Sequence, residues 1–196
     1  MKYIILITIF SLKMGLPCKG QETKHRAGYG AGAKISRIIV DDPELQSSYN
    51  TGLNLVAFNY EYKIKPKISL GFKLDLMFNK FLLSKGLEKE TIKYSTFSLP
   101  FKISYYPIRN LPFGISSSLS ATYLNQKQQI NLIEPYDLRN FFSSYEGELF
   151  FDRKLNNIVL RPFINYGHSI SNLISKESNQ RINANYSAFS FGLIIY

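Results

Sequence analysis

The segment ISLGFKLDLMFNK, residues 68–80, alternates apolar and polar side chains over nearly its whole length. One face carries Ile68, Leu70, Phe72, Leu74, Leu76 and Phe78, and the other carries Ser69, Gly71, Lys73, Asp75, Met77 and Asn79. A period of two is typical of a β-strand with one apolar and one polar face. The segment is longer than the usual soluble strand of about 5–6 residues and suits the roughly 9–11 tilted residues that cross a bilayer. It therefore predicts a membrane-spanning strand with its apolar face toward lipid.

The same alternation recurs along the rest of the chain. Residues 111–123 place Phe113, Ile115 and Leu119 on one face, opposite a face rich in serine. Repeating the assignment predicts an all-β fold, an eight-stranded antiparallel up-and-down transmembrane β-barrel. The predicted strands are residues 26–36, 50–64, 67–80, 91–106, 111–125, 140–153, 158–172 and 184–196.

The predicted connections alternate in length. Short turns are expected at 65–66, 107–110 and 155–157, and longer loops at 37–49, 81–90, 126–139 and 173–183. Short turns on one side and long loops on the other are typical of an outer-membrane barrel with both chain ends in the periplasm.

Residues 1–20 resemble a secretory signal peptide, which leaves residues 21–196 as the barrel domain. Lys2 gives the positive start, residues 4–12 form a short apolar core, and residues 18–20 offer a cleavage site after Gly20. The apolar run is far shorter than the roughly 20 residues of a spanning helix. Cys18, the only cysteine, would leave with the signal, although lipid attachment at Cys18 remains an alternative.

The composition argues against several classes of function. The formal charge is +10, but the basic residues are scattered and form no nucleic-acid-binding motif, so no nucleic acid is expected as a partner. Two histidines and one cysteine make no convincing zinc ligand set, and no metal site is predicted. Gly28, Gly30 and Gly32 lie in a strand and indicate close backbone packing, not a nucleotide loop, so no cofactor is predicted.

Charged residues on the polar strand faces are expected to meet in the lumen. The predicted network contains Glu61, Lys63, Lys73, Asp75, Lys102, Glu146, Glu148 and Arg161. An eight-stranded barrel is just wide enough for side chains to fill it, so these charges are expected to pair and close the lumen. The hairpin of the sixth and seventh predicted strands favours pairing of Arg161 with Glu148 or a nearby acid. Catalysis by Glu146 and Glu148 is the alternative interpretation, but facing cations favour ionised partners over a tuned acid and base.

His168 raises a second alternative, because an imidazole near serine can activate a hydroxyl nucleophile. The segment Tyr166–Leu173 resembles the His-x-Ser-Asn motif of lipid A 3-O-deacylases, which are also eight-stranded barrels. In this chain Ser169 and Ser171 lie one and three positions from His168, so both are expected on the opposite strand face. Glu177 would have to orient the ring.

His168 is otherwise expected to be an outward-facing residue at the rim of the barrel. The same aromatic girdle would include Tyr94, Tyr123, Tyr166 and Tyr186. No catalytic residue is predicted, and the protein is not expected to be an enzyme.

Residues 96–106, 166–173 and 189–196 are together similar to small outer-membrane barrels of Bacteroidota, the PorT-like and OmpA-type barrel domains. Residues 96–106, TFSLPFKISYY, resemble a Leu/Ile-Pro-Leu-x-x-Lys-Tyr strand of that family, and residues 166–173 resemble its Tyr-x-x-Gly-Leu-Thr-Asn-Ile segment. Residues 189–196, FSFGLIIY, resemble its last strand, which ends on an aromatic residue that the barrel-assembly machinery recognises. The resemblance implies architecture, and it spans members linked to type IX secretion as well as many without a known role.

The leading expectation is an integral outer-membrane barrel of a Gram-negative cell envelope with a structural or partner-binding role. Its expected partners are outer-membrane lipid, the barrel-assembly machinery and another envelope or secretion-system protein. A lipid A deacylase-like hydrolase using His168 and Ser171 is the first alternative. A periplasmic lipid-binding barrel is the second, and it requires an apolar lumen with a polar exterior.

Overall fold

A computed structural model describes residues 24–41, 45–47, 50–108, 111–126, 139–173 and 184–196. The described residues form strands and turns, with strands at β1 His25–Val40, β2 Leu45–Ser47, β3 Asn50–Lys65, β4 Ile68–Lys85, β5 Glu88–Tyr105, β6 Phe113–Gln126, β7 Phe141–Phe151, β8 Arg153–Leu155, β9 Ile158–Ser169 and β10 Ala184–Ile195. The predicted signal peptide, residues 1–20, lies outside the described residues.

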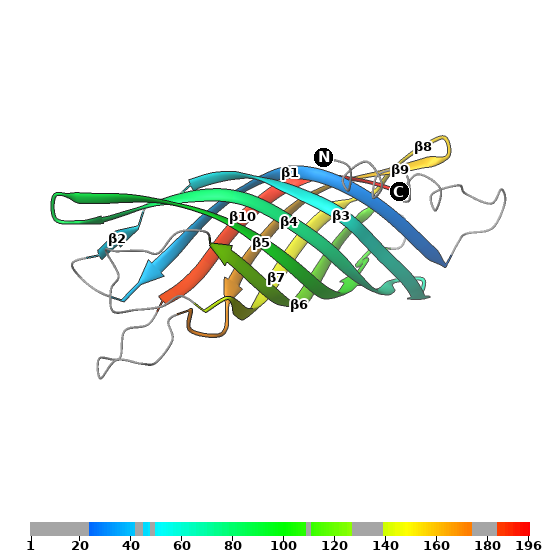
Figure 1. Ribbon diagram of the computed structural model, residues 1–196. Coiled ribbons are helices and arrows are strands. Elements are labelled where there is room, and N and C mark those ends of the chain that lie inside the picture. The colour runs from blue at the N-terminus through cyan, green and yellow to red at the C-terminus, as the bar shows by residue number, and fades with distance from the viewer. Residues whose placement is uncertain (1–23, 42–44, 48–49, 109–110, 127–138, 174–183) are drawn as a thin grey trace.

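Eight long strands make one antiparallel barrel (Figure 1). The order is β10-β1-β3-β4-β5-β6-β7-β9, and pairing of β9 with β10 completes the circle. The two three-residue strands are additions, because β2 pairs with the end of β4 and β8 forms a short hairpin with the start of β9. The predicted eight-stranded antiparallel barrel is confirmed.

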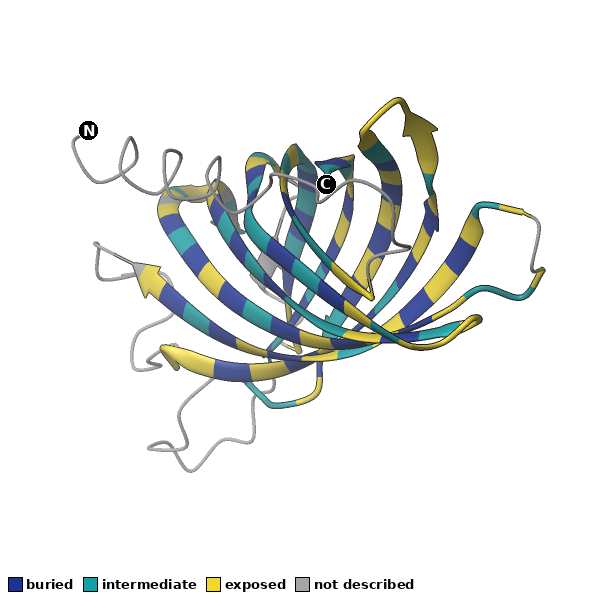
Figure 2. Cartoon of the chain, turned by 90° about the vertical axis from the view of Figure 1, so that its right-hand side faces the viewer, coloured by how far each residue is buried: buried dark blue, intermediate teal, exposed yellow. Residues whose placement is uncertain are grey.

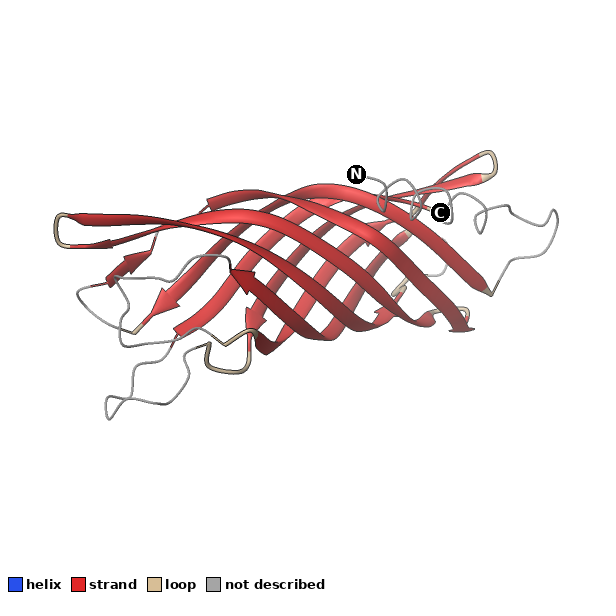
Figure 3. Cartoon of the chain, in the orientation of Figure 1, coloured by secondary structure: helices blue, strands red, loops and turns tan. Residues whose placement is uncertain are grey.

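The two ends of the barrel differ, as Figure 1 shows. β1 begins and β10 ends at the same end as the β8–β9 turn, while the β4–β5 hairpin extends beyond the opposite end. In Figure 3 the strands run obliquely across the barrel, as closure of eight strands requires. Because the periplasmic turns of outer-membrane barrels are short, we expect the hairpin end to be extracellular, and we label the two ends of the barrel extracellular and periplasmic on that expectation.

The β4–β5 hairpin corrects one expectation. Residues 81–90 were expected to be a long loop, but the two strands continue in unbroken register to a turn at Gly86 and Leu87. Gly86 has a φ of 58°, which glycine adopts without strain. The many charged residues of this segment are typical of a loop, which is why a loop was expected. A hairpin that extends beyond the membrane can also carry charge on both faces.

The barrel wall is apolar outside and polar inside. Figure 2 shows buried residues alternating with intermediate or exposed ones along most of each long strand in view. Phe78, Phe101 and Leu119 on the outside are 55%, 60% and 64% exposed, whereas Ser36, Asn54 and Thr122 are buried. These faces are the reverse of those that a soluble lipid-binding barrel requires.

A bulge in β3 keeps its polar residues inside. The register against β4 shifts between Val56 and Phe58, so two residues of β3 oppose one residue of its partner. Asn54 and Val56 are buried before the bulge, and Asn59 and Glu61 are buried after it. Simple alternation along the sequence could not place both pairs on one face.

Glycines allow the first and last strands to meet closely. Gly30 lies opposite Ile194 and Gly32 lies opposite Gly192 in the β1–β10 pair. A Cβ atom on Gly30 would overlap the carbonyl oxygen of Leu193. The glycines of β1 therefore allow close backbone packing between β1 and β10, the strand pair that closes the barrel.

Candidate functional site: the charged interior of the barrel

The predicted charged residues reach the lumen from five strands. Glu61 lies on β3, Lys73 and Asp75 on β4, Lys102 on β5, Glu146 and Glu148 on β7, and Arg161 on β9. All seven side chains are buried, with 0–6% of each residue exposed. Lys63 is half-buried and lies at the mouth of the barrel, beside a cavity of about 60 Å³ lined in part by Lys24, Arg26 and Glu61.

Arg161 is the centre of the periplasmic half of this interior. Its Nε and Nη2 atoms donate to the two carboxylate oxygens of Asp152 at 2.5 and 2.8 Å, and its Nη1 donates to Glu61. Nη2 also donates to the hydroxyl of Tyr106 at 2.8 Å. The guanidinium is fully buried, so its charge is balanced by these contacts and not by water.

Aromatic rings hold the guanidinium plane of Arg161. The carbon Cζ lies 4.0 Å from the ring centre of Phe150 and 4.8 Å from that of Tyr196. These rings pack with an apolar cluster of Val56, Phe150, Phe163 and Ile194. Arginine favours such stacking because its planar guanidinium is weakly hydrated.

The predicted pairing of Arg161 with Glu148 is wrong, although a nearby acid is indeed its partner. Glu148 lies opposite Asn165 in the β7–β9 register, four positions from Arg161. Asp152 and Glu61 take its place. Asp152 continues the alternation that places Glu146 and Glu148 inside, so the sequence could have predicted it. Arg26 occupies an inward position of β1 by the same argument, and it pairs with Asp152 at 2.8 Å.

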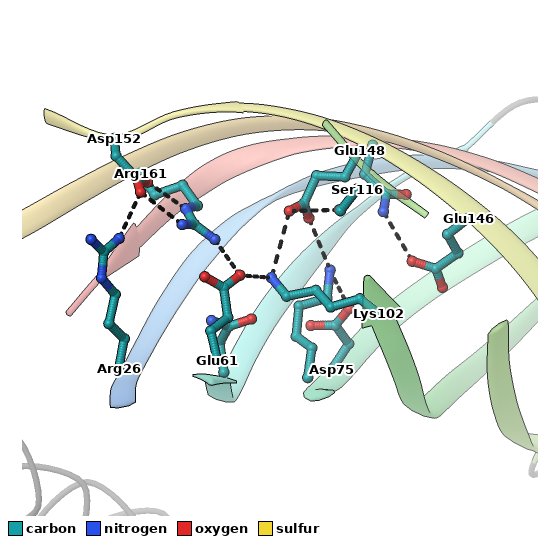
Figure 4. A network of polar contacts seen from close by, with 12 residues as sticks. Arg26, Glu61, Asp75, Lys102, Ser116, Glu146, Glu148, Asp152 and Arg161 are labelled. Carbon is teal, nitrogen blue, oxygen red and sulfur yellow. Dashed lines mark hydrogen bonds and ion pairs between the residues drawn. The ribbon is translucent and has the colours of Figure 1, made fainter. Parts of the chain in front are cut away.

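The contacts continue across the lumen as one chain of alternating charges (Figure 4). Lys102 Nζ lies 2.7 Å from Glu61 Oε1 and 3.7 Å from Glu148 Oε1. Lys73 Nζ then lies 3.6 Å from Glu148 Oε2 and 3.0 Å from Asp75 Oδ2. We call this series the ion-pair chain; in order, its members are Arg26, Asp152, Arg161, Glu61, Lys102, Glu148, Lys73 and Asp75.

Glu146 stands outside the ion-pair chain. Its Oε2 accepts a hydrogen bond of 2.9 Å from Asn165 Nδ2, while Glu148 is held by two lysines. The two carboxylates therefore share a strand face but have different partners. Lys34 is also buried, and its Nζ lies 5.9 Å from the ring centre of Tyr186.

The extracellular half of the interior is polar but carries less charge. Tyr94 and Tyr186 are both 5% exposed, so the expectation that they belong to an outer girdle is wrong. The Tyr94 hydroxyl lies 2.7 Å from Ser36 Oγ, to which Asn79 Nδ2 also donates. Both tyrosines occupy inward positions of their strands, which their parity already indicated.

His168 and its neighbouring serines do not come together. His168 lies on the outer face of β9, whereas Ser169 is buried and its Oγ accepts a hydrogen bond from the Tyr186 backbone N–H at 2.9 Å. Ser171 Oγ accepts from the backbone N–H of Ser143 at 3.0 Å. Glu177, the expected orienting acid, lies outside the described residues.

Neither a cluster of metal-ligating side chains nor a membrane-spanning helix occurs in the described part of the chain. No group of three or more histidine, cysteine, aspartate or glutamate side chains is arranged to hold a metal ion there. The same residues contain no helix of the length and hydropathy needed to span a membrane.

Solved structures provide the comparison, because no protein-family model and no curated protein matches the chain. It is similar to the outer membrane protein OprG from Pseudomonas aeruginosa, with a TM-score of 0.58, 15% identity, and coverage of 91% of this chain and 97% of that chain. Neisserial surface protein A matches with a TM-score of 0.52 and 11% identity, over 88% of this chain and 99% of that chain. Ail of Yersinia pestis, solved with the heparin analogue sucrose octasulfate, matches with a TM-score of 0.51 and 12% identity, over 89% and 100%. The chain therefore has the fold of small outer-membrane β-barrels.

Proposed function

We propose that this protein is an integral outer-membrane barrel with a closed lumen, which acts structurally or by binding another protein of the envelope. It reaches the membrane through a cleaved signal peptide, residues 1–20, and is inserted by the barrel-assembly machinery. It is neither an enzyme nor a pore. We place it among the PorT-like barrels of Bacteroidota on the three segments that resemble them.

The ion-pair chain is the observation that supports a closed lumen. It joins side chains from β1, β3, β4, β5 and β9 with Glu148 of β7 and Asp152 just beyond it, and thus crosses the barrel. Next to it, Phe150 and Phe163 fill the lumen from the β7 and β9 walls. A barrel of eight strands leaves little room beyond such side chains.

A closed interior directs function to the outer surfaces. The β4–β5 hairpin extends beyond the barrel (Figure 1), and Leu87 at its turn is fully exposed. The projecting hairpin is accessible from outside the barrel, and it is the surface where we propose contact with another envelope or secretion-system protein.

The purified barrel is expected to give no steady single-channel conductance in a planar bilayer, because the ion-pair chain blocks the lumen. Heat-modifiable migration of the same preparation checks that the barrel is folded. A variant with serine at Glu61, Lys102 and Arg161 is the comparison, since it removes three large side chains of the crossing. Stable conductance steps of the unaltered protein would contradict the proposal.

Lipid A is expected to keep its acyl chains in cells that produce this protein. His168 and Ser169 lie on opposite faces of β9, and a general base must lie about 2.6–3.2 Å from the hydroxyl that it activates. Mass spectrometry of lipid A would compare the unaltered protein with His168→Ala and Ser171→Ala. Acyl loss that depends on both residues would establish the hydrolase alternative.

A further inference from the structure

Two lysines lie directly opposite one another on the outer face of the β4–β5 pair. Lys80 is aligned with Lys93, and both side chains are exposed. Within the described residues, neither ammonium group has a carboxylate at ion-pair distance. Like charges at opposed positions destabilise an antiparallel strand pair. An anion bound between the two ammonium groups would relieve this repulsion.

The depth of the two lysines places them at the lipid headgroups. The outward positions from Ile68 to Phe78 are apolar, and Lys80 is the first charged residue after them. At a tilt of about 40°, this stretch rises roughly 25 Å, the height of the apolar band of an outer-membrane barrel. Lys80 and Lys93 thus lie just beyond the hydrocarbon, on the side of the projecting hairpin.

Charge on the hairpin is sorted by face. The register of β4 and β5 is unbroken, so alternation assigns each residue to a side. Lys89 shares the outward side with Lys80 and Lys93, whereas Glu88 and Glu90 fall on the other side. The side toward lipid is therefore cationic, and the acids are kept from neutralising it.

A groove of about 610 Å³ adjoins the lysine pair. Its outward-facing lining is Thr51, Leu53, Phe78, Lys80, Lys93, Ser95 and Asn125. Leu53 and Phe78 are 53% and 55% exposed and form apolar walls below the two ammonium groups. Apolar walls beneath paired cations are complementary to a lipid that carries phosphate above its acyl chains.

We infer that Lys80 and Lys93 bind a phosphate of the glycolipid in the outer leaflet, with an acyl chain of that lipid against Leu53 and Phe78. The bisphosphorylated disaccharide of lipid A has this chemistry and lies on the extracellular side. The inference rests on the proposed place of the barrel in the outer membrane, but not on its closed lumen.

The test measures binding of lipid A to the folded barrel in zwitterionic detergent. Lys80→Gln/Lys93→Gln is expected to weaken binding of bisphosphorylated lipid A by roughly 10- to 30-fold, since each lysine near a lipid surface contributes about 1 kcal/mol. Dephosphorylated lipid A is expected to bind the unaltered protein equally weakly. The control Lys65→Gln/Lys154→Gln removes the same charge from exposed positions at the periplasmic end and is expected to change nothing.

The melting temperature gives a second readout, because the double variant and the unaltered barrel are expected to rank differently without and with lipid A. Without lipid A, Lys80→Gln/Lys93→Gln is expected to melt at the same temperature as the unaltered barrel or higher, because repulsion is removed. With lipid A, proteins that keep both lysines are expected to gain more stability than the double variant, because they bind the lipid more tightly. Equal affinity of the double variant, or equal binding of phosphatidylglycerol or inorganic phosphate, would overturn the inference, and none of these results bears on conductance.

Discussion

Arg161→Met is expected to lower the free energy of unfolding of the barrel by about 3–5 kcal/mol, the usual effect of removing one partner from a buried ion pair. The variant leaves Glu61 and Asp152 facing one another across the space of the guanidinium. Methionine keeps much of the apolar stem, so the loss is mainly electrostatic. Denaturant titration of the barrel in detergent, followed by heat-modifiable migration, measures the effect.

Two double variants distinguish the partner that the structure assigns from the one that the sequence suggested. Glu61→Gln with Arg161→Met removes one charge of each sign from contacting residues and is expected to recover part of the stability. Glu148→Gln with Arg161→Met leaves both true partners of Arg161 in place and is expected to recover none. Recovery in the second variant alone would contradict the observed pairing.

Leu74→Arg is expected to cost about 2–4 kcal/mol and to reduce assembly into the membrane severely, because it places a charge near the bilayer midplane. Leu74 occupies an outward position of β4 near the middle of the apolar stretch from Ile68 to Phe78. The yield of heat-modifiable barrel in isolated membranes measures the effect.

Leu155→Arg is the matched control for that prediction. It makes the same chemical change on β8, in the exposed hairpin at the periplasmic end. Assembly of this variant is expected to be close to normal, since the cost of a charge falls toward the interface. Normal assembly of Leu74→Arg, equal to that of Leu155→Arg, would show that Leu74 does not face lipid.

The alternation of side chains was enough to predict the fold and most of the charged interior. Lys73, Asp75, Lys102 and Glu148 lie on strands without irregularities, so parity placed them correctly inside. The length of the β4–β5 hairpin was harder to predict from the sequence, because polar residues outside the membrane can form paired strands as readily as a loop.

The partners within the interior could not be read from the sequence. Which charges meet depends on the stagger between neighbouring strands and on the bulge in β3, neither of which leaves a simple pattern. Arg161 and Glu61 are 100 positions apart, and their contact exists only because the barrel closes. The failed pairing with Glu148 came from assuming that charges of one hairpin lie opposite each other.

The ion-pair chain also bears on how the barrel is built. Its contacts join residues up to 126 positions apart, so few of them can form within a growing hairpin. A half-assembled sheet would expose single charges of both signs without their partners, at a high cost in a lipid environment. Only pairing of β1 with β10 brings all of them together, and Tyr196 then stacks on Arg161 next to that seam. Assembly is therefore expected to be highly cooperative, with no stable partial barrel along the way.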